Sequence, residues 1–340
     1  MNITTVDQLE EVLSRPAAAD VEFMRALEGD LLILGVGGKM GPSLARRARR
    51  AADGAGVKTR VIGVSRFSSG GLQQRLDQAG IETISADLLD DRDLEALPDI
   101  ENVIFMAARK FGTTGAEHLT WALNTYLPGR VAARFHKSRI VAFSSGNVYP
   151  LVPVVEGGAT EQTPAAPVGE YAASVLGRER MFEHFSEMFG TRGVLLRLNY
   201  AIDLRYGVLL DTGTKVFEGR TVNLAMGSVN VIWQGDANSV TLRALSIASA
   251  PPRVLNLTGP ELLSVRWIAQ EFARRFGVKP VLEGVESPTA LLNNAAECQK
   301  LFGYPTVSVS QLIEWTAGWI RAGGSTLNKP THFEARDGKF

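Results

Sequence analysis

The sequence predicts an α/β fold in which a doubly wound parallel sheet is followed by a smaller C-terminal lobe. From Leu31 to about Tyr200, short apolar segments alternate with segments of helical periodicity, which is typical of such sheets. The first apolar segment ends in a glycine-rich turn. Beyond about Leu204 the alternation gives way to shorter and less regular segments.

Residues 30–52 are predicted to form the first strand and the first helix of this pattern. "DLLILGVGG" holds a four-residue apolar run between an acid and glycines, which suits a strand buried on both faces of a parallel sheet. Pro42–Ala52 keeps one face apolar and is expected to be a helix. Its solvated side is predicted to carry Arg46, Arg47, Arg49 and Arg50.

The alternation continues to residue 200. We expect strands at "TRVIGVSR", "ETISADL", "NVIFMAA", "RIVAFSS" and "GVLLRLNY", and helices at "GGLQQRLDQAG", "DRDLEAL", 116–135 and 170–189. Residues 150–168 contain four prolines and predict a long irregular loop. In the distal half, helices are expected at 264–276 and 308–321.

The composition is that of an ordinary soluble protein. Lys plus Arg equals Asp plus Glu at 36 each, so neither a nucleic-acid partner nor an anionic membrane is indicated. No window approaches the roughly 18 apolar residues of a membrane helix. Cys298 is the single cysteine and the histidines lack ligand spacing, so we expect no disulfide, no metal site and a cytoplasmic location.

The glycine-rich turn "GVGGKMG" predicts dinucleotide binding. It lies between the first strand and the first helix, where Gly35 allows a tight turn, Gly38 allows the backbone to approach a diphosphate, and Gly41 allows the helix to pack on the strand. The helix N-terminus adds positive potential. The second strand then ends in Ser65 and Arg66 with no carboxylate. A guanidinium beside a hydroxyl suits a 2′-phosphate, so NADP(H) is favoured, with NAD(H) as the alternative.

Several motifs together make the chain similar to a known family. The glycine turn is followed by "ADLLD" after the third strand, "MAA" after the fourth, "FSSGNVY" at the fifth and "EYAAS" beyond the proline loop. In this order and spacing they resemble the extended short-chain dehydrogenases, and more narrowly the NAD-dependent epimerase/dehydratase family. The resemblance runs from about Leu31 to Gly323 and includes "VIWQGDAN" and "VLNLTGPELLSVRWIA".

The resemblance divides the chain into four predicted parts: a helical extension at 1–30, a dinucleotide-binding Rossmann domain at 31–200, a substrate-binding lobe at 201–325 and a tail at 326–340. It also implies which residues contact the cofactor, among them Asp87 at the adenine and Ala107 and Ala108 beside the nicotinamide ribose. The alternative is that Asp87 only caps a turn and that the two alanines only pack tightly. The implied cofactor residues are Gly35, Gly38, Lys39, Met40, Gly41, Ser65, Arg66, Asp87, Leu88, Ala107, Ala108, Asn124 and Tyr171.

Tyr171 matches the family's acid/base tyrosine, and Ser145 matches the residue that polarises the substrate carbonyl; otherwise Ser145 bonds the backbone at a strand end. The family's lysine, four residues after the tyrosine, holds the cofactor ribose and lowers the tyrosine pKa, and here Val175 replaces it. Arg178, two helical turns from Tyr171, or Lys110 could substitute. An exposed ion pair of Arg178 with Glu179 or Glu183 is the simpler expectation.

Two functions follow from these residues. The first is an oxidoreductase or epimerase that exchanges hydride with a secondary alcohol or ketone of a carbohydrate-like substrate. The second, suggested by Val175, is an NADP(H)-binding protein with little or no catalysis that serves in sensing or scaffolding. Helices 116–135 and 170–189 carry more apolar residues than one sheet face needs, and the family pairs such helices across a homodimer, which we therefore expect.

Overall fold

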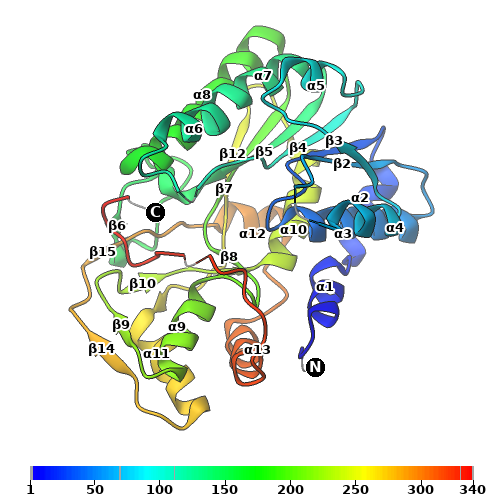
Figure 1. The fold of residues 1–340 in the computed structure, drawn as a ribbon. Coiled ribbons are helices and arrows are strands. Elements are labelled where there is room, and N and C mark those ends of the chain that lie inside the picture. Colours follow the sequence, from blue (N-terminus) through cyan, green and yellow to red (C-terminus); the bar gives the residue numbers. More distant parts are fainter. Residues whose placement is uncertain (1–2, 69, 111, 330, 339–340) are drawn as a thin grey trace.

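The computed structural model describes residues 3–68, 70–110, 112–329 and 331–338. Its centre is a seven-stranded sheet in which all neighbouring strands are parallel (Figure 1). This confirms the predicted doubly wound sheet, because the chain runs from β1 outward to one side and then returns to build the other. In spatial order the strands are β12 (Arg253–Leu257), β7 (Gly193–Leu198), β5 (Arg139–Ser145), β4 (Asn102–Phe105), β1 (Leu31–Leu34), β2 (Val61–Ser65) and β3 (Glu82–Ser85).

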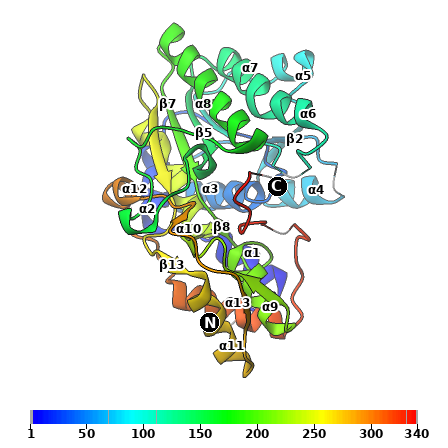
Figure 2. The ribbon, with the colours of Figure 1, turned by 90° about the vertical axis from the view of Figure 1, so that its left-hand side faces the viewer.

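Helices cover both faces of the sheet (Figure 2). Leu31 and Ile33 of β1 pack into one core cluster, while Leu32 and Leu34 pack into another on the opposite face. All four residues are fully buried, which explains the continuous apolar run in the sequence. The first cluster is covered by α2 (Ala18–Ala26), α3 (Gly41–Ala55), α4 (Leu72–Gln78), α10 (Gln234–Arg243) and α12 (Ala296–Phe302), the second by α5 (Asp91–Glu95), α7 (Leu127–Arg134) and α8 (Gly169–Phe189).

The helix expected at 116–135 is interrupted by a π-helical turn. It consists of α6 (Glu117–Trp121), the π turn η1 (Ala122–Tyr126) and α7. Pro128 lacks an N–H and so cannot donate to the carbonyl of Asn124, four residues earlier. Arg178 Nε donates to that carbonyl oxygen instead, at 3.3 Å. A π turn of this kind often marks a functional site.

The distal lobe packs α9 (Val208–Phe217) against α11 (Val265–Phe276) and α13 (Val309–Arg321). The last two confirm the helices expected there, whereas α9, α10 and α12 were not anticipated. β12 joins the central sheet from beyond residue 200, and the division of the chain at that residue stays a prediction. Short strands complete the lobe and the proline loop: β6 (Val152–Pro153), β8 (Ala201–Ile202), β9 (Thr221–Asn223), β10 (Ser228–Val229), β11 (Ile232–Trp233), β13 (Leu263–Ser264), β14 (Val281–Glu283) and β15 (Thr289–Ala290).

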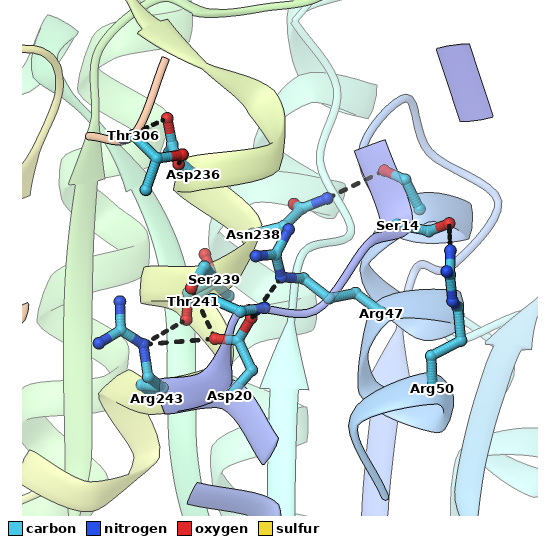
Figure 3. A network of polar contacts seen from close by, with 12 residues as sticks. Ser14, Asp20, Arg47, Arg50, Asp236, Asn238, Ser239, Thr241, Arg243 and Thr306 are labelled. Carbon is cyan, nitrogen blue, oxygen red and sulfur yellow. Dashed lines mark hydrogen bonds and ion pairs between the residues drawn. The ribbon is translucent and has the colours of Figure 1, made fainter. Parts of the chain in front are cut away.

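The N-terminal extension folds as α1 (Val6–Ser14) and α2, and a buried polar network fastens it to the sheet domain (Figure 3). The fully buried Asp20 carboxylate accepts hydrogen bonds from Arg47 Nε at 2.7 Å and Ser239 Oγ at 2.6 Å, and it pairs with Arg243 Nε at 3.4 Å. Arg47 is only 5% exposed, so its predicted place on a solvated face is wrong. The reason is that the extension covers this face of α3 and provides the counter-charge.

The C-terminal tail packs between the distal lobe and the start of α8; Figure 1 shows it, in red, running between the lobe and the sheet domain. Phe333 is 2% exposed within the core of the lobe. Asp211 Oδ2 accepts from Thr331 N at 2.8 Å and from its Oγ1 at 2.6 Å. Gly338 lies against Gly169, the first residue of α8. Among the described residues, no helix is long and apolar enough to cross a membrane.

Candidate functional site

A cavity of about 320 Å³ opens at the carboxyl ends of the central strands, beside β1 where the strand order reverses. Ligands of open α/β sheets bind at this position. The cavity wall combines the glycine turn, the segments after β4 and β5, the first turns of α8, residues after β7 and the C-terminal tail. Ser145, Tyr171 and Ala108 all line it, so the structure brings these three predicted site residues together.

The glycine turn has the shape that a diphosphate requires. Gly35 has φ +88°, and a Cβ there would lie 2.6 Å from Ala107 N. A Cβ on Gly41 would overlap the carbonyl of Val36, so any larger residue would push α3 away from the turn. Gly38 is exposed, and its added Cβ would meet only Gly35 O, at 3.3 Å. The turn therefore leaves open backbone at the N-terminus of a 15-residue helix, where an anion is stabilised.

Lys39 and Met40 of this turn point in different directions. Met40 is 7% exposed and packs in the core. Lys39 reaches the distal lobe, where its Nζ donates to Ala201 O at 2.6 Å and lies 4.1 Å from the ring centroid of Tyr206. Burial lowers the pKa of Lys39 to about 8, although the charge of Asp203 opposes this shift. Lys39 thus connects the two lobes across the cavity.

The residues predicted to select the cofactor lie at the ends of β2 and β3. Ser65 Oγ is so close to Gly37 that a Cβ on this glycine would overlap it. Arg66 has 68% of its side chain exposed and pairs with Asp87 at 3.8 Å. Asp87 Oδ1 also accepts from Leu89 N at 3.1 Å, and Leu88 is buried. The structure therefore places an exposed guanidinium beside Ser65, with a carboxylate as its neighbour.

Tyr171 and Ser145 line the same cavity, and the Ser145 side chain acts to lower the pKa of the Tyr171 phenol. Tyr171 belongs to the first turn of α8 and is 9% exposed. Ser145 ends β5, donates from Oγ to Asn147 Oδ1 at 2.9 Å and accepts from Asn147 N at 3.2 Å. Burial raises the pKa of Tyr171, while the charge of Arg178 and the Ser145 side chain oppose the rise. The cavity therefore holds a phenol and a serine hydroxyl together, the two groups that a proton donor and a polarising group would require.

Arg178 lies inside the protein, so the expectation of an exposed ion pair is wrong. It is 2% exposed, and its guanidinium donates to Phe143 O at 2.6 Å, Ala107 O at 3.2 Å and Asn124 Oδ1 at 3.1 Å, besides the Asn124 carbonyl. Burial lowers the pKa of Arg178 to about 10, which still leaves it charged at neutral pH. Val175 is 1% exposed and packs with apolar residues.

Asn124 ties this arginine to the rest of the site. Its Oδ1 accepts from Arg109 N at 2.9 Å as well as from Arg178, and its Nδ2 donates to Ser174 Oγ at 3.0 Å. Behind it, Glu179 is fully buried and accepts from Arg197 Nε at 2.9 Å and Nη2 at 2.6 Å, and from Ser144 Oγ at 2.5 Å. The site is therefore supported by hydrogen-bonded buried charges.

Lys110, the other possible substitute for the missing lysine, also lines the cavity. Its Nζ lies 5.7 Å from the ring centroid of Tyr171, and burial lowers its pKa to about 8. Tyr200 and Tyr206 also line the cavity, and burial raises the pKa of both. Lys329 enters the wall from the tail, for which the sequence offered no pattern. Asn199 lines the cavity as well and donates to Asn230 Oδ1 at 2.9 Å.

Within the described ranges, no group of three or more His, Cys, Asp or Glu side chains could hold a metal ion. Cys298 is buried, and burial raises its pKa to about 12, so it is a neutral thiol at ordinary pH.

The model of the NAD dependent epimerase/dehydratase family matches residues 31–202, which is half of the chain, and the chain belongs to this family. The match covers the glycine turn, Ser145 and Tyr171. Among curated proteins, none matches the chain.

Solved structures with low sequence identity share the fold. UDP-glucose 4-epimerase from Thermotoga maritima, solved with UDP-glucose, is 16% identical with a TM-score of 0.71. UDP-glucuronic acid 4-epimerase from Bacillus cereus, in complex with UDP-glucuronic acid and NAD, is 19% identical with a TM-score of 0.72. UDP-glucose 4-epimerase from Thermus thermophilus, in complex with NAD, is 18% identical with a TM-score of 0.69. Each comparison covers 86% of this chain and 99% of the other.

Proposed function

We propose that this chain is an NAD(P)-dependent oxidoreductase or epimerase that acts on a secondary alcohol or ketone of a sugar or sugar-derived substrate. The observation that carries the proposal is that Tyr171 and Ser145 line one cavity bounded by the glycine turn. Family membership supports the same reading, as do the UDP-sugar epimerases that share the fold. From those proteins we take the proposal that the substrate is a sugar, but not that the sugar carries a nucleotide.

A bound nicotinamide dinucleotide would supply hydride exchange at its pyridine ring. The open backbone of Gly38 and the N-terminus of α3 suit its diphosphate. Asp87 and Leu88 would lie at its adenine, and Ala107, Ala108 and Asn124 beside its nicotinamide ribose. The exposed Arg66 beside Ser65 favours a 2′-phosphate and therefore NADP(H), with NAD(H) as the alternative.

The chain's own residues would handle the proton. Tyr171 would donate a proton to, or accept one from, the substrate oxygen, and Ser145 would hold that oxygen in place. General acid/base help of this kind is worth roughly 10²- to 10⁴-fold in rate. Burial alone would make the phenol a poor proton donor or acceptor at neutral pH, and the charge of Arg178 counters this effect. We therefore assign to Arg178 the electrostatic role that a lysine has at the position of Val175.

Absorbance of the reduced nicotinamide tests this proposal. Purified protein, NADP⁺ or NAD⁺ and a panel of sugars and sugar acids should give turnover that Tyr171→Phe reduces by roughly 10²-fold or more. An epimerase would show product without net reduction, which sugar chromatography detects. Binding of neither dinucleotide, or equal turnover in both variants, would refute the proposal.

A second candidate is a cofactor-binding protein with little catalysis. The net rise in the pKa of Tyr171 favours it, because a phenol that stays protonated is a weak base. This candidate predicts tight NADP(H) binding with negligible rates in wild type and Tyr171→Phe alike. The expected homodimer is a separate proposal. It is supported by Leu119 and Tyr126, which are 41% and 58% exposed and lie in 116–135, one of the two helical segments expected to pair across the dimer. Light scattering at low protein concentration tests whether the dimer forms.

A further inference from the structure

The C-terminal tail is anchored in the distal lobe. Asp211 Oδ2 of α9 accepts from Thr331 N at 2.8 Å and from its Oγ1 at 2.6 Å. Phe333 is 2% exposed and belongs to the core cluster of the lobe. A buried aromatic ring and a carboxylate with two donors both hold the tail against the lobe.

Arg336 joins the tail to a second part of the lobe. Its Nη1 donates to Thr289 O and its Nη2 to Thr289 Oγ1, both at 2.7 Å, and Nη1 also donates to Ala225 O at 3.3 Å. Thr289 belongs to β15, which pairs with β6 of the proline loop. The tail is therefore held by the lobe on both sides of Phe333.

Beyond Arg336 the tail touches helix α8 through a contact between two glycines. A Cβ on Gly338 would overlap Val168 O, and a Cβ on Gly169 would lie 2.5 Å from Gly338 O. Gly338 has φ +72° and Gly169 has φ +84°, values that favour glycine as well. The two backbones therefore approach so closely that neither position has room for a side chain.

The contact lies at the start of the helix that carries the proposed acid/base residue. Gly169 and Tyr171 are the first and third residues of α8. Val168 is the N-cap, and valine has no polar side chain with which to cap the helix. The tail thus packs against an end of α8 that no capping side chain stabilises.

The tail also borders the cavity that holds Tyr171. Lys329 lines the cavity wall. The charge of Asp211, which holds Thr331, raises the pKa of Lys110, another lining residue, against the effect of burial. The tail therefore runs from the wall of the cavity to the start of α8. A displacement of about 1 Å between reacting groups can cost on the order of 10²-fold in rate, so a contact that fixes this helix end matters for catalysis.

We propose that Gly338 is a positioning residue for the proposed reaction. Its contact with Val168 and Gly169 holds the first turn of α8, so that the Tyr171 hydroxyl stays aligned with a substrate bound against the distal lobe. Gly338 would act through the position of Tyr171 and not on the reacting atoms. The inference rests on the proposed function and extends it to the tail, which lies outside the residues matched by the family model, 31–202.

Gly338→Ala tests this inference, with Gly277→Ala as the matched control. Gly277 has φ +70° and nothing within 4 Å of an added Cβ, so the control carries a similar backbone strain without the contact. Hydrogen–deuterium exchange is measured at residues 168–175 with the preferred dinucleotide bound, and kcat is measured at saturating dinucleotide and sugar. Relative to the control, Gly338→Ala should speed this exchange and lower kcat, each by roughly tenfold or more, and leave dinucleotide affinity unchanged.

A second variant loosens the same contact from a different residue. Arg336→Met frees the tail from Thr289 and should change exchange and kcat in the same direction. If either reading of Gly338→Ala equals that of Gly277→Ala, or if Arg336→Met leaves both readings at wild-type levels, the inference is overturned. Failure of the proposed function is distinct, since it appears as absent dinucleotide binding by the wild type or as turnover that survives Tyr171→Phe.

Discussion

Replacing Arg178 tests the electrostatic part of the proposed site. The Arg178→Met variant keeps the approximate length of the side chain but removes its charge and the four hydrogen bonds to Phe143, Ala107 and Asn124. Of the two groups that oppose the raised pKa of Tyr171, only Ser145 then remains. The pKa of Tyr171 should rise further, and turnover at neutral pH should fall by roughly 10²- to 10⁴-fold.

The loss of stability can be worked from the same contacts. Each buried acceptor left without a donor costs about 1 to 3 kcal/mol, and relief from burying the charge offsets part of the total. We expect a net loss of about 2 to 4 kcal/mol in the free energy of unfolding. Arg178→Lys keeps the positive charge, so it should lose less activity than Arg178→Met. It should still lose some activity relative to the wild type, because one nitrogen cannot reach the acceptors on all three segments.

Two assays separate the role of the charge from a purely structural role. The ultraviolet absorbance of phenolate, titrated in each variant with and without Tyr171→Phe, reports the pKa of Tyr171 without any substrate. Urea unfolding reports stability. Arg180→Met is the control, because Arg180 lies on the same helix, has 60% of its side chain exposed and pairs with Glu183 at the surface. If folded Arg178→Met keeps the wild-type phenolate titration and turnover, the reasoning is refuted.

Three further predictions concern the cofactor, the buried ion pair and pH. Arg66→Ala should weaken NADPH binding more than NADH binding in fluorescence titrations, and an equal effect on both would contradict NADP(H) selection. Glu179→Gln should destabilise the fold by about 3 to 5 kcal/mol in urea unfolding, because Arg197 stays buried without its partner; a change below about 1 kcal/mol would contradict this. The pKa values of Lys39 and Lys110 are lowered from 10.5 to about 8, so between these pH values the unfolded chain binds more protons and stability should rise with pH. Lys39→Met and Lys110→Met should each reduce the slope of the unfolding free energy against pH, measured by urea unfolding at several pH values. An unchanged slope in both variants would contradict the lowered pKa values of these lysines.

The sheet was predictable because its signals are local. The four-residue run of β1 is apolar on both faces, and Gly35 and Gly41 mark positions where a Cβ would collide with neighbouring backbone. Tyr171 and Ser145 were found through motif spacing, and they do meet in one cavity.

The missed features depend on partners that are distant in the chain. Arg47 is indistinguishable in sequence from the partly exposed arginines beside it, and its burial depends on Asp20, which α2 brings against α3. Arg178 likewise belongs to the site because acceptors of three distant segments, on Phe143, Ala107 and Asn124, meet at its guanidinium. Lys329 reaches the cavity because the tail is anchored by the buried Phe333. Periodicity cannot reveal such contacts, since each is created by tertiary packing.

The most direct test of the account is the affinity of the glycine turn for a dinucleotide. Gly38→Val should keep the fold with a small shift of the turn, since its Cβ meets only the carbonyl of Gly35, at a tight 3.3 Å, yet it would cover the backbone proposed to hold the diphosphate. Gly318→Val, in open space on α13, is the matched control. Fluorescence titration should show NADPH or NADH binding to wild type and Gly318→Val and loss of binding in Gly38→Val. Undiminished binding by Gly38→Val, or none by the wild type, would contradict the central claim.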